Sequence, residues 1–199
     1  GGGRARIGLP RALNIYEMLP FWAELFCSLG CDIVLSKVSS RNIYMKGQNT
    51  IPSDTVCYPA KLVHGHIIDL LEKDLDAIFY PCMSYTFDEG ISDNCYNCPI
   101  VAYYPELIQA NIPDIEKIHF LYPHLGIENH KLLAERMYEE FKNIIPKLSK
   151  KEMEKAVENA FKSYYEYREA VRQEGSRVLK FAEENNYPVI ILASRPYHI

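Results

Sequence analysis

Residues 76–82 have the sequence Asp76-Ala77-Ile78-Phe79-Tyr80-Pro81-Cys82. The apolar run is too short for a helix and ends at a proline, which predicts a buried strand with Cys82 directly after its carboxyl end. Residues 6–9 and 31–35 form similar short apolar runs, and apolar residues at helical spacing fill residues 15–29 between them. This alternation predicts an α/β fold with a doubly wound, largely parallel sheet and flanking helices.

The rest of the chain continues the alternation. We expect strands over 100–102 and 117–121. We expect helices from Ser39 or Ser40 to Gly47, over 104–110 and over 128–145, and one more helix that follows a possible N-cap at 53–55. A long C-terminal helix begins at Ser149 and breaks at Asn185-Asn186. We expect a domain over 4–147 whose sheet edge carries cysteines, a connecting helix over 148–186, and over 187–199 the truncated first strand of a following domain.

Length and composition limit the classes of function. A chain of 199 residues with 48% hydrophobic and 24% charged residues is typical of one large globular domain, or one domain with a fragment of another. The net charge of -4 gives no overall positive field, so we expect neither nucleic acid nor a membrane as a partner. No run approaches the roughly 20 apolar residues of a membrane span. We therefore expect a cytoplasmic protein.

The six cysteines are spread unevenly, which favours thiols kept for chemistry over a disulfide framework. Cys27 and Cys31 have apolar neighbours, and we expect both in the core. The others adjoin a predicted strand end, a helix start or the irregular stretch 81–99: Cys57, Cys82, Cys95 and Cys98. Ligands bind outside the carboxyl ends of parallel strands, so these thiols could hold a soft metal or an iron-sulfur cluster. The alternative is that Cys57 and Cys82 are buried and inert.

Four polar residues near the same predicted edge are candidates for binding a cofactor: Arg11, Asn14, Lys61 and His64. Arg11 and Asn14 follow the first strand and could meet a phosphate, or could serve the start of the helix. Lys61 is one helical turn from Cys57 and could support a thiolate, or could simply be solvated. His64 and His66 point to different sides of a helix, which favours packing over a two-histidine metal site. The chain has no Gly-x-x-x-x-Gly-Lys loop, so we expect no ATP site.

Several stretches together resemble a known family. They are Ile7-Gly8-Leu9-Pro10-Arg11-Ala12-Leu13-Asn14, Ser53-Asp54-Thr55-Val56-Cys57-Tyr58-Pro59-Ala60-Lys61-Leu62-Val63-His64-Gly65-His66, Tyr80-Pro81-Cys82 and Asn97-Cys98-Pro99. The resemblance is to the uncharacterised domain of CoA-substrate-specific enzyme activases, large bacterial proteins described as activators of (R)-2-hydroxyglutaryl-CoA dehydratase. It covers nearly the whole chain.

The resemblance implies more than the residues alone. This region of the family resembles the iron-sulfur subunits of 2-hydroxyacyl-CoA dehydratases and benzoyl-CoA reductases from anaerobic bacteria. By that resemblance, Cys57, Cys82 and Cys98 hold a low-potential 4Fe-4S cluster, and Cys95 is a spare ligand or the alternative to Cys98. An ATP-dependent activase module would supply the electron, and a dehydratase-like module with an acyl-CoA would use it. We expect no catalysis by this chain alone; the alternatives are a metal-free scaffold that docks the activator and a structural zinc site.

Overall fold

Four strands form one parallel sheet in the computed structural model, which describes residues 2–88, 90 and 93–198. The strand order is β2-β1-β3-β4 across that described part of the chain. In register, Ile7 lies opposite both Ile33 and Ala77, and Ile78 lies opposite Phe120. The strands are β1 (Arg6–Leu9), β2 (Asp32–Leu35), β3 (Ala77–Phe79) and β4 (His119–Leu121). The predicted α/β class with a parallel sheet is confirmed.

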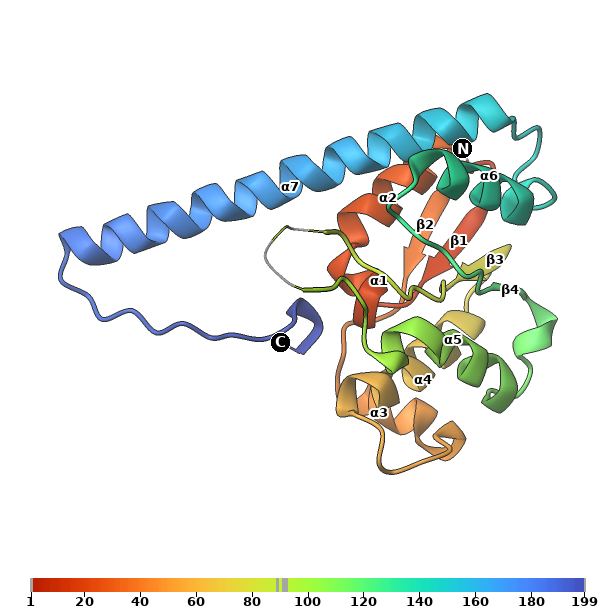
Figure 1. Ribbon diagram of the computed structural model, residues 1–199. Helices are drawn as coiled ribbons and strands as arrows, with labels where there is room; N and C mark the ends of the chain where they lie inside the picture. The colour runs from red at the N-terminus through yellow and green to blue at the C-terminus, as the bar shows by residue number, and fades with distance from the viewer. Residues whose placement is uncertain (1, 89, 91–92, 199) are drawn as a thin grey trace.

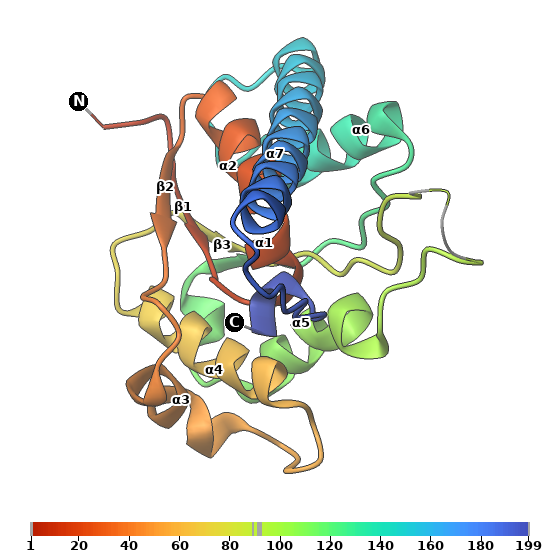
Figure 2. The same ribbon diagram turned by 90° about the vertical axis from the view of Figure 1, so that its left-hand side faces the viewer.

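Helices cover both faces of this sheet, as expected for a doubly wound fold (Figures 1 and 2). One face carries α1 (Leu13–Glu17), α2 (Leu19–Ser28), α6 (His130–Phe141) and α7 (Lys150–Glu184). The other carries α3 (Arg41–Gly47), α4 (Tyr58–Leu71) and α5 (Pro99–Asn111). Three single turns complete the set: η1 (Gln48–Thr50), η2 (Ile115–Lys117) and η3 (Pro196–His198).

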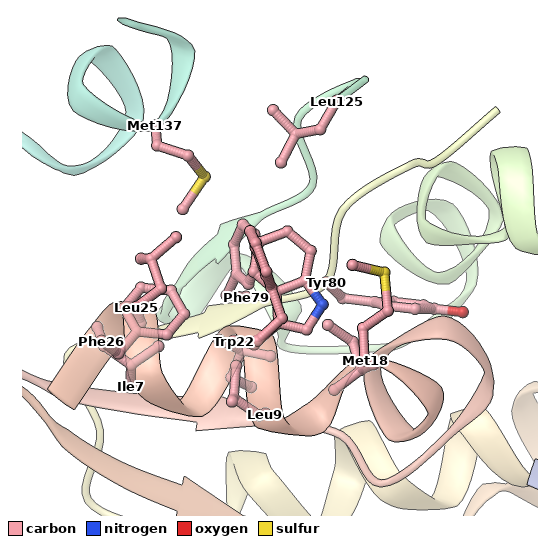
Figure 3. Packing of buried hydrophobic residues seen from close by; sticks show 14 of the residues in the cluster. Ile7, Leu9, Met18, Trp22, Leu25, Phe26, Phe79, Tyr80, Leu125 and Met137 are labelled. Atoms are coloured by element: carbon pink, nitrogen blue, oxygen red, sulfur yellow. The ribbon is translucent and has the colours of Figure 1, made fainter. Parts of the chain in front are cut away.

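The core between α2, α6 and the sheet is built around Phe79 (Figure 3). Its ring centroid lies 5.0 Å from that of Trp22, 5.4 Å from that of Phe26 and 5.6 Å from that of Phe141. The first two pairs meet edge to face, an arrangement that adds to the free energy gained by burying the rings. Successive side chains of a strand point to opposite faces of the sheet. Since Phe79 faces α2, the residues next to it in the strand face α4.

On the other face, α3 lies directly on α4 because two glycines let the backbones touch. A Cβ atom added to Gly65 would stand 1.7 Å from the carbonyl oxygen of Ile43, and one added to Gly47 would stand 2.3 Å from the backbone nitrogen of Gly65. No side chain larger than hydrogen fits at either crossing point. The close approach fixes the position of α4, and so of the residues at its N-terminus.

The predicted start of the long helix is confirmed. Ser149 accepts a hydrogen bond from the backbone nitrogen of Glu152, and the Glu152 carboxylate accepts one from Ser149 in return, which is a capping box. The first half of α7 packs on α2 and α6, whereas Val171 and Val178 in its second half are exposed. No helix of the described residues is both long and apolar enough to cross a membrane; α7 has the length but is densely charged.

The main secondary-structure error is the strand predicted over 100–102, which is wrong. These residues form the first turn of α5, which begins at Pro99 and includes the predicted helix 104–110. The residues that α5 buries recur at helical spacing: Val101, Ala102, Tyr104, Pro105 and Ile108. A proline in the first turn of a helix has no amide to lose, so Pro99 is the signal that was available in the sequence.

Smaller differences concern where helices begin. The segment predicted as one helix over 15–29 is two helices, α1 and α2, which meet at Met18, and Pro20 stands in the first turn of the second. Ser40 caps α3 as predicted, but α4 begins at Tyr58 with Cys57 as its N-cap, not after 53–55. The irregular stretch 81–99 is irregular where it is described; residues 89, 91 and 92 lie outside the described residues.

Residues 187–193 follow the predicted break at Asn186, which adopts a φ of 54°. In the structure they belong to no strand, and Ile190, Ile191 and Leu192 are more than 80% exposed. Beyond them, η3 returns to the body of the domain beside α1 (Figure 2). The Arg195 guanidinium there pairs with the Glu17 carboxylate at 2.6 Å. That this segment opens a following domain stays a prediction, and Ile199 lies outside the described residues.

Candidate metal centre

Two cysteines occupy matching positions at the start of neighbouring helices. Cys57 is the N-cap of α4 and Cys98 the N-cap of α5, with backbone angles of φ -62°, ψ 152° and φ -62°, ψ 154°. Neither side chain hydrogen-bonds its helix, each helix has a proline in its first turn, and both residues are exposed. The positive end of a helix dipole favours a thiolate, so both positions suit a metal-binding sulfur.

Cys82 approaches the same edge from the sheet. Its backbone continues β3 beyond Phe79, because its nitrogen donates to Pro123 and its carbonyl accepts from Leu125, both at 2.9 Å. The side chain is only 1% exposed. Burial, and then the charge of Glu106, raise the pKa of the thiol to about 11. Without a cation beside it, this thiol therefore stays protonated at neutral pH.

Tyr80 indicates that these three thiols share one neighbourhood. Its pKa is raised well above its ordinary value, first by burial, then by Tyr104 and by the thiols of Cys82, Cys98 and Cys57. Tyr197 in η3 also has a raised pKa, to which Cys98 and Cys57 contribute after burial, against the lowering effect of Arg195. Each of the three thiols therefore contributes to the electrostatic environment of Tyr80.

The remaining thiols lie elsewhere. Cys95 is half-buried in an arm closed by backbone hydrogen bonds from Thr86 to Cys95 and from Asn97 to Ser84, both 2.9 Å. Burial and then the Asp88 carboxylate raise the pKa of the Cys95 thiol. The charged neighbours of Cys95 therefore differ from the groups that act on Tyr80. Cys31 is buried as predicted, but Cys27 is exposed, because it follows Phe26 on α2 and turns away from the stripe that faces the sheet.

Two of the four proposed cofactor-binding residues carry polar atoms that make no hydrogen bond within the described residues. Asn14 is 4% exposed, and both its side-chain oxygen and nitrogen lack a partner. The buried Nε of Arg11 also lacks a hydrogen-bond partner among the described residues. The backbone nitrogen of Arg11 donates to Ser36 Oγ at 2.8 Å. Buried polar groups are normally paired, so both residues are suited to contact a ligand at the carboxyl end of β1.

The other two residues have partners within the protein. Lys61 Nζ donates to the carbonyl oxygen of Asp54 at 2.8 Å. His64 lies between Thr50 and Tyr104, with its Nδ1 2.7 Å from Thr50 Oγ1 and its Nε2 3.0 Å from the Tyr104 hydroxyl. Since Tyr104 belongs to α5, the His64 imidazole ties α4 to α5 close to the two N-caps.

The structure adds three residues that the sequence analysis did not single out. Tyr80 is one, and its spacing of two residues from Cys82 in a strand was the available signal. Glu106 and His124 are the others: together with Cys82 they place three possible metal-ligand atoms within 4.8 Å of one another. His124 Nε2 is 2.8 Å from Glu106 Oε1. No sequence spacing indicates this group, because residues 82, 106 and 124 come together only in the fold.

A pocket of ≈ 450 Å³ lies at the start of α4, where Tyr58 and Pro59 line it. Its aromatic walls are Tyr58 and Tyr197, and its polar side is formed by Ser39, Ser40 and Arg41. Tyr58 is 56% exposed and stacks on Tyr44 with centroids 5.6 Å apart. The start of α4 therefore has space for part of a ligand with both a ring and a polar group.

The fold and its edge of thiols define an α/β domain with a candidate thiolate metal centre. The chain belongs to the family described as CoA enzyme activase uncharacterised domain (DUF2229), which matches residues 6–199. No curated protein and no solved structure matches the chain.

Proposed function

We propose that this domain contributes Cys57, Cys82 and Cys98 as ligands to a low-potential iron-sulfur cluster that transfers electrons within a CoA enzyme activase. The observation that carries the proposal is that Cys57 and Cys98 occupy matching N-cap positions on α4 and α5 while Cys82 extends β3. Thiolates are the usual protein ligands of such clusters. Cluster ligands bind different irons and so stand farther apart than the ligands of a single ion, which suits three thiols that arrive from β3, α4 and α5.

The cluster would place this domain between two partners. We propose an ATP-dependent activase module as the electron donor and a dehydratase-like module acting on an acyl-CoA as the acceptor, in keeping with family membership. The pocket at the start of α4, which Tyr58 lines one residue after Cys57, supports a substrate or partner group that binds at this end of the helix. We place this chemistry in the cytoplasm, because all six cysteines are free and reduced thiols persist there.

The test is iron and acid-labile sulfide per chain after anaerobic reconstitution. We expect iron and sulfide in the unchanged chain, and loss of most of both in Cys57→Ala, Cys82→Ala and Cys98→Ala. Cys27→Ala is the matched control, because its thiol is exposed on α2 and should bind no iron. Thermal melting of each metal-free variant separates loss of a ligand from loss of folding. Equal iron in all four variants would contradict the proposal.

A mononuclear zinc site is the second candidate, and the group of Cys82, Glu106 and His124 favours it. Sulfur, carboxylate oxygen and imidazole nitrogen are all zinc ligands, and a fourth position would be left to water. His124→Gln distinguishes the two, because it removes a ligand of this site and none of the three thiols. Tight stoichiometric zinc that His124→Gln abolishes, together with no iron after reconstitution, would replace the cluster proposal with the zinc site.

A further inference from the structure

The Tyr80 hydroxyl is buried and makes no hydrogen bond within the described residues. The residue is 0% exposed, and its ring projects away from the group formed by Phe79 and Trp22 (Figure 3). Buried tyrosine hydroxyls normally find a partner, because an unpaired polar group inside a protein is destabilising. A buried hydroxyl without a hydrogen-bond partner among the described residues indicates a partner that binds from outside the chain.

The direction of the Tyr80 side chain follows from the sheet. Phe79 packs on α2, so its neighbours Ile78 and Tyr80 point to the opposite face. That face is the one covered by α4, because a Cβ atom added to Gly8 would meet Ile78 and Leu70 of α4 at 3.3 and 3.4 Å. Cys82, two residues after Tyr80 in the extended chain, follows the same alternation.

Three cysteines are candidates for carrying the partner of this hydroxyl. Cys57 and Cys98 begin the two helices on that face, and Cys82 follows Tyr80 on the strand. These thiols all contribute to the raised pKa of Tyr80, after burial and Tyr104. A tyrosine hydroxyl carries a proton at neutral pH and can donate it in a hydrogen bond.

We infer that Tyr80 is a binding residue of the metal centre and that its hydroxyl donates a hydrogen bond to a ligated sulfur. The inference rests on the proposed function, in which Cys57, Cys82 and Cys98 carry the metal. Hydrogen bonds to cluster sulfurs are among the factors that set reduction potential. A donor here stabilises the more negatively charged reduced state, so it raises the potential.

Tyr104 provides the matched control for a Tyr80→Phe variant. Its hydroxyl lies on the same face but already has a protein partner, His64 Nε2, at 3.0 Å. Removal of the Tyr80 hydroxyl from the metal-free chain breaks no hydrogen bond, whereas removal of the Tyr104 hydroxyl breaks one. We therefore expect Tyr80→Phe to melt at the same temperature as the unchanged chain or higher, and Tyr104→Phe to melt lower.

The decisive readout is the midpoint potential after anaerobic reconstitution. We expect Tyr80→Phe to bind as much iron as the unchanged chain and to have a more negative potential. A melting temperature of metal-free Tyr80→Phe lowered as much as that of Tyr104→Phe would overturn the inference, because the hydroxyl would then have a protein partner. Full iron with an unchanged potential would overturn the inference and leave the proposed function standing. No iron in the unchanged chain would overturn both.

Discussion

His64 and His66 make the folded chain sensitive to acid. Both side chains are 0% exposed, and burial lowers the pKa of each imidazole from 6.5 to about 4. For His66, Asp69 opposes this effect, while the charges of Arg11 and Lys73 add to it. The folded chain therefore holds both rings neutral at pH values where an unfolded chain protonates them.

The size of the effect follows from proton linkage. Between about pH 6.5 and pH 4 the unfolded state binds more protons than the folded state, so the free energy of unfolding decreases as the pH falls. At about pH 5 the ordinary pKa lies about 1.5 units above the solvent pH, and each unit is equivalent to about 1.4 kcal/mol. Each histidine then removes about 2 kcal/mol, and the pair about 4 kcal/mol, out of the roughly 5–15 kcal/mol typical of a domain.

Urea denaturation of the metal-free chain at about pH 7.5 and about pH 5 measures this loss. We expect His64→Gln to be less stable than the unchanged chain at the higher pH, because Thr50 and Tyr104 lose their partner, but to lose only about half as much stability on acidification. His119→Gln is the control, since His119 is exposed on β4. An equal loss on acidification in the unchanged chain and in His64→Gln would refute the reasoning.

Three further predictions concern stability. Gly65→Ala should displace α3 from α4 and lower the free energy of unfolding by roughly 4–5 kcal/mol, as severe substitutions do. Gly175→Ala in α7 should be neutral or stabilising, because no atom lies near the added Cβ atom. Calorimetric melting of both variants checks this prediction. Ser149→Ala removes the capping box and should cost about 1 kcal/mol, measured as a shift of the urea midpoint at constant slope. Phe79→Ala should cost about 3–5 kcal/mol by leaving a cavity between Trp22 and Phe26; an unfolding free energy within about 1 kcal/mol of the unchanged chain would contradict this packing.

Much of the sheet could be predicted because its two central strands, β1 and β3, are buried on both faces. The segments 6–9, 31–35 and 76–80 each consist of one charged residue at or near the start followed by an uninterrupted apolar run, which is typical of parallel strands. The run at 100–102 has the same composition but forms a helix, because Pro99 begins a segment that packs one side on the domain. Local composition cannot distinguish a buried strand from the buried first turn of a helix.

That Cys82 follows a strand and Cys57 precedes a helix could be predicted from the sequence, and the rule that ligands bind at the carboxyl ends of parallel strands is the reason to expect a shared site. The sequence could not predict the unpaired hydroxyl of Tyr80 or the hydrogen bond between His64 and Tyr104. Each depends on which side chains meet across elements far apart in sequence. Cys27 shows the same limit at short range: apolar neighbours in sequence placed it in the core, yet one further residue along α2 turns it to solvent.

Electron uptake by the reconstituted chain tests the proposed cluster most directly. Anaerobic titration with dithionite, followed by visible absorbance and electron paramagnetic resonance, measures whether the iron accepts electrons. We predict bleaching of a sulfur-to-iron band and a paramagnetic signal that Cys27→Ala retains and Cys98→Ala loses. A chain whose absorbance and resonance stay unchanged on reduction, or a signal that survives in Cys98→Ala, would contradict the assignment of an electron-transfer centre to this edge of the sheet.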